Sequence, residues 1–291
     1  MHQSITALPE LPVRPADSHK GTFGRVLIVA GSPGMSGAAA LAGAGALRGG
    51  AGLVSVAVPA SILPIVAAIE PSYLTVPLSV DRRGQLSHAA LGEVWAAIDG
   101  KNACGLGPGM GTRGITAEVI LSLYADAELP MVIDADALNC LAKNPDLMKQ
   151  HAGPRILTPH PGEFARLLQC DIAEVQAHRE ELAIRFAEEN QVVLVLKGAG
   201  TVVTDGTRVY VNTTGNSGMA TGGTGDVLTG LMTALLAQKM SPFEAAQLAV
   251  YMHGCAGDLA ASQLSQPGLI ASDLPRALCH VWLKLQQQHS I

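Results

Sequence analysis

The chain has 291 residues, a formal net charge of −5 and a sequence pI near 6.0. This acidic balance argues against a nucleic-acid binder, because such proteins usually carry a clustered basic excess. Hydrophobic residues make up 48% and charged residues 15% of the chain, which excludes a disordered protein and a coiled coil. Aromatic residues make up 3%, so we expect a core of small and aliphatic side chains.

The cysteines and the apolar segments indicate a cytoplasmic protein. The five cysteines include no Cys-x-x-Cys pair, so reduced thiols fit better than disulfides or a zinc site. The N-terminus has neither a basic region nor an apolar run, so we expect no signal peptide. The uncharged stretches 26–47 and 49–69 contain glycine and proline and alternate strand and helix patterns. We therefore expect them in a buried core and not in a membrane.

Strand and helix patterns alternate along the chain. A polar, proline-containing segment, 1–20, is expected to form an extended lead-in. Apolar runs then predict strands at 25–30, 53–58, 102–106, 130–134, 155–158, 192–197, 201–204 and 208–212. Helices are predicted at 38–48, 61–69, 87–99, 114–125, 135–142, 161–168, 173–190, 225–237, 242–262 and 271–287. This alternation predicts βαβ units and a mostly parallel sheet covered on both faces, within one domain over 21–291.

The strongest chemical signal is a glycine-rich segment, Asn212 to Asp226, that leads into an apolar helix. Its glycines allow backbone amides to converge, and the helix N-terminus adds partial positive charge, which suits a phosphate. Asp226 would be repelled there unless it accepts a proton from a hydroxyl that attacks phosphorus. An Asp that only caps the helix is the alternative. The density of glycines favours the catalytic interpretation. No Gly-Lys-Ser/Thr follows, so this is not a Walker A loop.

Three further segments follow predicted strands, where ligands of open α/β sheets bind. The segment 105–111 is not a Rossmann fingerprint, but its backbone could approach a ligand; a tight turn is the alternative. His160, in Thr158–Glu163, lies at a strand end and favours function over a plain helix start. Lys197, in Lys197–Thr201, could reach a phosphate from beside two glycines, with an ordinary turn as the alternative.

Other positions have two equally plausible interpretations or favour a structural one. Asp134 and Asp136 could hold Mg²⁺, or could cap the helix that follows them. The small residues of 36–40 suit either close contact with a ligand or tight helix packing. His253, in an Ala-rich helix, favours a core histidine with its hydrogen bonds satisfied.

Together these motifs resemble the ribokinase-like superfamily, whose fold is a three-layer α/β/α sandwich with a central, mostly parallel sheet. Gly222–Asp226 resembles its phosphoryl-transfer signature. Thr158–Glu163 resembles its Asn-x-x-Glu element, with His160 in place of the Asn. That replacement, combined with 29–32, 197–201 and 216–226, resembles the ADP-dependent NAD(P)H-hydrate dehydratase branch over about residues 18–285.

The resemblance implies a lyase of nicotinamide nucleotide repair. With ADP, it would dehydrate the S-epimer of NAD(P)H hydrate to NAD(P)H and release AMP and phosphate. Asp226 would be the catalytic carboxylate and would touch the hydrate, and Glu163 would act through Mg²⁺ or water. The other hydrate contacts would be Ala40, Gly107 and His160; the nucleotide contacts would be Lys197, Gly198, Ala199, Gly200, Thr201 and Gly225. The family also implies a cytoplasmic homotetramer.

Two other functions stay open at this point. An ATP-dependent kinase of a small hydroxymethyl substrate would keep the fold and yield a stable phosphate ester. An adenine-nucleotide sensor would bind without turnover, but it has no use for Asp226. Some family members carry a hydrate epimerase domain ahead of this one; about 20 residues precede the first predicted strand, so we expect none here.

Overall fold

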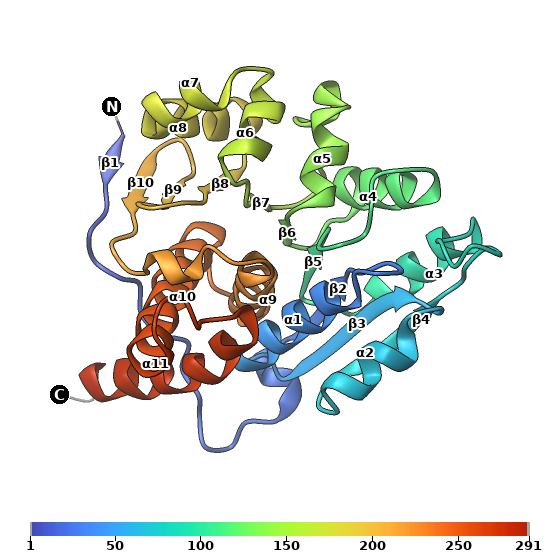
Figure 1. Cartoon of the computed structure of the whole chain (residues 1–291), viewed down its shortest axis with the longest axis horizontal. Helices are drawn as coiled ribbons and strands as arrows, with labels where there is room; N and C mark the ends of the chain where they lie inside the picture. The colour runs from blue at the N-terminus through green and yellow to red at the C-terminus, as the bar shows by residue number, and fades with distance from the viewer. Residues whose placement is uncertain (1, 290–291) are drawn as a thin grey trace.

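A ten-stranded sheet forms the middle of the computed structural model, which describes residues 2–289 (Figure 1). Its strand order is β1-β10-β9-β8-β7-β6-β5-β2-β3-β4. The pairs β8–β9 and β9–β10 are antiparallel and the others are parallel. The strands are Gln3–Ser4 (β1), Arg25–Val29 (β2), Leu53–Pro59 (β3), Leu74–Leu78 (β4), Ala103–Leu106 (β5), Met131–Ile133 (β6), Arg155–Leu157 (β7), Val193–Leu196 (β8), Val202–Thr204 (β9) and Arg208–Val211 (β10).

Helices cover both faces of the sheet, and each face has its own apolar core. One layer holds α1 (Ser36–Arg48), α2 (Leu63–Ile69), α9 (Thr224–Ala237), α10 (Pro242–Leu264) and α11 (Leu274–His289). The other holds α3 (Ala89–Ile98), α4 (Ile115–Asp126), α5 (Asp136–Ala142), α6 (Pro161–Leu168), α7 (Ile172–Ala177) and α8 (Arg179–Asn190). Short 3₁₀ turns lie at Lys20–Phe23, Pro145–Leu147, Ser217–Met219 and Ala271–Asp273. The expected three-layer sandwich is confirmed.

Small residues set the close packing of α1 against α9. A Cβ atom added at Gly230 would overlap the carbonyl oxygen of Ala42, and one added at Gly45 would overlap that of Val227. These glycines let the two backbones touch, so the chain needs few large side chains in this layer. Tight helix packing therefore explains the small residues in the middle of α1, and the two interpretations of residues 36–40 stay open.

Three differences from the predicted elements have physical reasons. The edge strand β4 was missed because Pro77 interrupts its pattern; an edge strand tolerates the missing amide. The two-residue β1 was also missed, and it pairs with β10 from within the lead-in segment. The prediction of one helix over 173–190 was wrong, because His178 has φ −130° and ψ 36° and separates α7 from α8.

The thiols and the helix lengths agree with the sequence expectations. All five cysteines are free, two of them fully buried. Among residues 2–289, no helix has both the length and the apolar composition to cross a bilayer. The boundary at residue 20 between a lead-in and a catalytic domain stays a prediction.

Candidate active site

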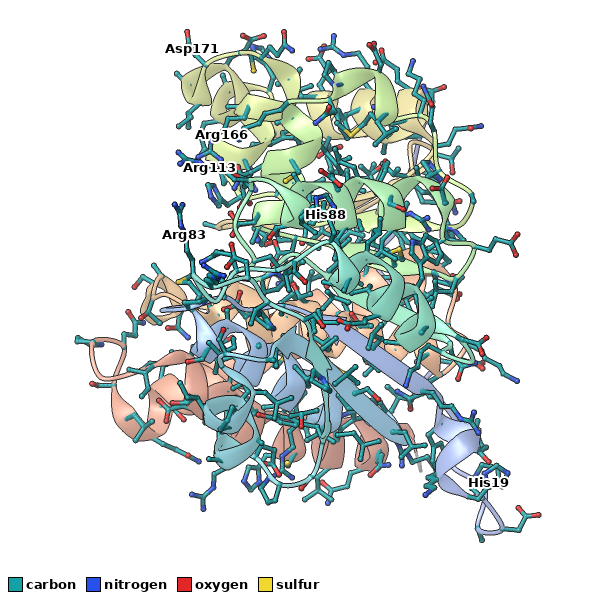
Figure 2. The ribbon with its side chains drawn as sticks, turned by 90° about the vertical axis from the view of Figure 1, so that its right-hand side faces the viewer. His19, Arg83, His88, Arg113, Arg166 and Asp171 are labelled. Atoms are coloured by element: carbon teal, nitrogen blue, oxygen red, sulfur yellow. The ribbon has the colours of Figure 1, made fainter. Side chains whose placement is uncertain are left out.

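The loops that follow the parallel strands gather at one edge of the sheet. Figure 2 shows Arg83, Arg113 and Arg166, which follow β4, β5 and β7, together on the left-hand side. His19, which precedes β2, lies at the lower right. The amide of Gly31, after β2, donates to the carbonyl of Pro108, after β5, at 2.8 Å. The candidate site is built at this carboxyl edge, as expected for an open α/β sheet.

The glycine-rich segment ends at the first turn of α9, where backbone amides and a carboxylate face the same space. Gly223 occupies the N-cap with φ +95° and supplies no side-chain cap. Within the described residues, the amides of Thr224, Gly225 and Asp226 find no acceptor, and the Asp226 carboxylate has no hydrogen bond or ion pair. Asp226 therefore does not cap its helix. Free amides and a free carboxylate are left beside each other at a helix N-terminus.

The acidity of Asp226 is strongly perturbed. Burial raises its pKa, and the nearby carboxylate of Asp134 raises it further. Lys197 opposes these effects, Asp136 and Glu163 add to them, and the resulting pKa is about 7. A general base works best when its pKa lies near the working pH. This carboxylate is therefore matched to proton transfer at neutral pH.

A buried ion pair lies next to this carboxylate. Lys197 begins the segment Lys197–Thr201, here called the lysine loop, and its Nζ lies 2.7 Å from Asp134 Oδ1 and 3.9 Å from Glu163 Oε2. The other Asp134 oxygen accepts a hydrogen bond of 2.7 Å from the hydroxyl of Thr229. Burial alone would lower the pKa of Lys197, but the two carboxylates outweigh it and raise that pKa. The lysine is a fixed cation.

The lysine loop is held open by glycine conformations and by an arginine from α8. Gly198 has φ +132° and Gly200 has φ +66°, values that favour glycine. The Arg179 guanidinium donates to the carbonyls of Leu196 and Lys197 at 3.0 and 3.2 Å. Sequence reasoning missed this arginine, because nothing in the sequence of α8 indicates which carbonyls its charged side chains reach.

His160 and Glu163 form a reciprocal cap at the start of α6. The Nδ1 atom of His160 accepts from the amides of Gly162 and Glu163 at 3.0 and 3.3 Å. Glu163 Oε2 accepts from the His160 amide at 2.8 Å. Burial and the Lys197 charge lower the pKa of His160, so the ring is neutral and carries its proton on Nε2. That side chain is 51% exposed, and its Nε2 atom lies 3.5 Å from Glu163 Oε1, while Nδ1 accepts from the helix amides.

The glycine loop after β5 lies close against α5. A Cβ atom at Gly107, where φ is +123°, would overlap the carbonyl oxygen of Asp134, so this position requires glycine. The Asp136 carboxylate accepts from the amide of Gly111 at 2.8 Å and fixes the far end of the loop. The helix-cap interpretation of Asp134 is wrong, because Ala135 is the N-cap and the Asp134 carboxylate pairs with Lys197. The Mg²⁺ interpretation of Asp134 and Asp136 stays a prediction.

Ala40 is buried near the start of α1 and lines a groove of about 390 Å³ between α1, α2 and α11. This groove borders the start of α9, because Leu41 and Ala271 flank Gly223. The contact expected between Ala40 and the hydrate stays a prediction, as do the contacts expected for Gly107 and His160.

Helix α10 anchors the glycine-rich segment from behind. His253 is buried, and its Nε2 lies 2.9 Å from the Thr224 carbonyl; burial lowers its pKa to about 4, so the neutral ring donates. The predicted core histidine is confirmed. Asp258 accepts from the Gly215 amide and from the Asn216 side chain, each at 2.9 Å. Sequence reasoning missed Asp258, although it lies five residues after His253 on the same helix.

A family model described as NAD(P)H-hydrate dehydratase matches residues 26–279. The chain belongs to this family. It is 44% identical, over 96% of its length, to a bifunctional NAD(P)H-hydrate repair enzyme Nnr of Moorella thermoacetica, and covers 53% of that protein. It is also 38% identical to an ADP-dependent (S)-NAD(P)H-hydrate dehydratase of Bacillus subtilis, with 95% of each chain covered. The family expected from the motifs is confirmed.

A solved structure gives the same assignment. The crystal structure of ADP/ATP-dependent NAD(P)H-hydrate dehydratase from Bacillus subtilis, co-crystallised with ATP/Mg²⁺, superimposes with a TM-score of 0.80. The two chains are 34% identical and 94% of each is covered. The chain spans about half the length of the bifunctional relatives it matches.

Proposed function

We propose that the chain dehydrates the S-epimer of NAD(P)H hydrate to NAD(P)H, using ADP and releasing AMP and phosphate. One observation carries this proposal: the free carboxylate of Asp226 lies beside the free amides at the start of α9. The similarity to an ADP-dependent (S)-NAD(P)H-hydrate dehydratase over 95% of both chains supports the substrate. The same site in a kinase would phosphorylate a hydroxyl and stop there.

The chemistry follows from the poor leaving ability of hydroxide. The hydroxyl oxygen of the hydrate attacks the terminal phosphorus of ADP, and the bond from that phosphorus to the bridging oxygen breaks, so AMP leaves. Asp226 accepts the hydroxyl proton. The amides of Thr224, Gly225 and Asp226 stabilise the charge on the moving phosphoryl group. The ring nitrogen then expels phosphate, and loss of a proton from the neighbouring ring carbon restores the dihydronicotinamide.

The remaining site residues bind and orient the two substrates in this proposal. Lys197 supplies a fixed positive charge for the nucleotide phosphates, and the lysine loop with Gly225 gives the backbone room to contact the nucleotide. Ala40, Gly107 and His160 contact the hydrate. The 51% exposure of the His160 side chain supports this, because a hydroxyl or a phosphate can reach its Nε2–H, which lies 3.5 Å from Glu163 Oε1.

Magnesium belongs to this proposal as a companion of the nucleotide. Mg²⁺ usually keeps several waters and binds phosphates with one or two carboxylates. Within residues 2–289, no group of three His, Cys, Asp or Glu side chains could hold a metal by itself, which fits an ion carried by phosphates. Glu163, a buried carboxylate at this edge, would hold it directly or through water. The ion would neutralise phosphate charge.

Product analysis separates this function from the kinase alternative. Purified protein is mixed with NADH hydrate, Mg²⁺ and either ADP or ATP, while near-ultraviolet absorbance and the nucleotide products are followed together. The proposal predicts that NADH and AMP appear in equal amounts with ADP. A kinase would instead give a stable phosphate ester, without NADH. Nucleotide binding without any turnover would support a sensor.

We also propose a cytoplasmic homotetramer. Free thiols support a reducing compartment. The exposed apolar side chains of Ile65, Ile69 and Leu74, at the β4 edge of the sheet, support burial between subunits. Light scattering after size-exclusion chromatography tests this, and a monomer would contradict it.

A further inference from the structure

We infer that Asp134 is a positioning residue of this reaction, whose carboxylate holds the Lys197 ammonium against the first turn of α9, beside Asp226. The inference deepens the proposed function and rests on it. The resemblance that assigned the other site residues gave no role to Asp134.

The Asp134 carboxylate connects three elements of the site. Asp134 follows β6, and its side chain is only 2% exposed. One carboxylate oxygen accepts a hydrogen bond of 2.7 Å from the ammonium of Lys197, which follows β8. The other oxygen accepts a hydrogen bond of 2.7 Å from the hydroxyl of Thr229. Thr229 is three residues after Asp226 in α9, so the two side chains lie on the same face of that helix. One buried carboxylate thus links the lysine loop to the helix that carries the base.

The packing around Gly225 shows where the Asp134 carboxylate holds the Lys197 ammonium. A Cβ atom at Gly225 would lie 3.4 Å from Lys197 Nζ and 3.8 Å from Asp134 Oδ2. The ion pair therefore lies directly over the first turn of α9. An ammonium has three N–H donors, and Asp134 takes one of them. The others remain for phosphate oxygens, with Glu163 Oε2 at 3.9 Å as the next carboxylate.

Asp134 and Lys197 shift the pKa of Asp226 in opposite directions. The charged groups that face Asp226 are Asp134 from β6, Lys197 from β8, Asp136 from α5 and Glu163 from α6. Lys197 favours the ionised base, and the carboxylates disfavour it. Removing Asp134 alone must therefore make Asp226 a stronger acid, whereas removing Lys197 alone must make it a weaker one. Both shifts are Coulomb effects of a pair that lies over the first turn of α9, and the ADP-binding measurement reports whether Asp134 also positions Lys197.

The test uses the paired variants Asp134→Asn and Lys197→Met. The Asp226 carboxyl carbon is titrated by NMR in both, and ADP binding is measured by calorimetry; neither readout requires turnover. We expect the Asp226 midpoint to move to lower pH in D134N and to higher pH in K197M. ADP binding should weaken about tenfold or more in both, the scale of a charge-assisted hydrogen bond. Exposed Asp146→Asn is the charge-matched control, in which neither readout should move.

The outcomes separate this inference from the proposed function. If the wild type lacks dehydratase activity, the function fails, while the titrations and ADP binding still test Asp134. Midpoints that move in the same direction, or D134N binding ADP within twofold of wild type, would overturn the inference. If a single variant does not fold because one buried charge is unpaired, the double variant D134N/K197M replaces it. The double variant should weaken ADP binding no further than the single variant that folds, and a clearly larger loss would contradict the pairing.

Discussion

Replacing Asp226 with Asn should slow the reaction strongly and at the same time stabilise the fold. The pKa of Asp226 is raised from 3.8 to about 7, chiefly by burial, so ionisation of this group opposes folding. The cost is absent below pH 4, grows as the pH rises to about 7, and is constant above that. At about 1.4 kcal/mol per pKa unit, the penalty at pH 8 amounts to up to about 4 kcal/mol. An Asn carries no charge and avoids this penalty.

The assay compares urea unfolding of the wild type and the D226N variant at pH 4.5 and pH 8. The variant should gain much more stability at pH 8 than at pH 4.5, and its rate should fall by about 10²–10⁴-fold. The wild-type rate should rise with pH around a midpoint near 7, because the base must be ionised. The reasoning fails if the variant is no more stable than the wild type at pH 8. A loss of rate below tenfold with intact ADP binding would reject the role as base.

Three further substitutions and one control substitution test the supporting structure. Gly230→Ala would drive a methyl group into the carbonyl of Ala42 and should cost about 1–3 kcal/mol in urea unfolding. Gly92→Ala, on an open face of α3, should instead stabilise slightly; equal effects of the two would contradict the packing described for α1 and α9. Arg179→Met removes the hydrogen bonds to the lysine loop and should raise KM for ADP about tenfold with kcat retained; an unchanged KM would mean that the loop needs no support. Arg155→Met leaves five backbone carbonyls, three of them on buried residues, without their guanidinium partner and should lower stability by about 3–5 kcal/mol, whereas a melting temperature unchanged in calorimetry would refute this.

The sequence predicted those features that local residue patterns determine. The strand ends, the glycine-rich segment and the hairpin β9–β10 each have a pattern of apolar periodicity or turn residues, and the structure confirms them. Buried parallel strands give continuous apolar runs that are hard to mistake. The family followed because several of these segments, far apart in the chain, agreed with one another.

The residues that support the site were not predictable in the same way. Arg179, Asp258 and Thr229 act through side chains that reach across the fold, and no spacing in the sequence indicates those partners. Asp134 was recognised as a candidate, but its partner Lys197 is 63 residues away. Only the order of β6, β7 and β8 in the sheet brings the two together. Sequence patterns therefore locate this site, and topology decides its electrostatics.

The fate of one oxygen atom tests most directly whether a phosphoryl group is transferred to the hydrate. NADH hydrate prepared in H₂¹⁸O carries the label in its ring hydroxyl, and the enzyme is then supplied with unlabelled ADP and water. If Asp226 activates that hydroxyl to attack phosphorus, the ¹⁸O must appear in the inorganic phosphate, one atom for each NADH formed. Label released into water, with unlabelled phosphate, would mean that the hydroxyl leaves without a phosphoryl group and would contradict the mechanism.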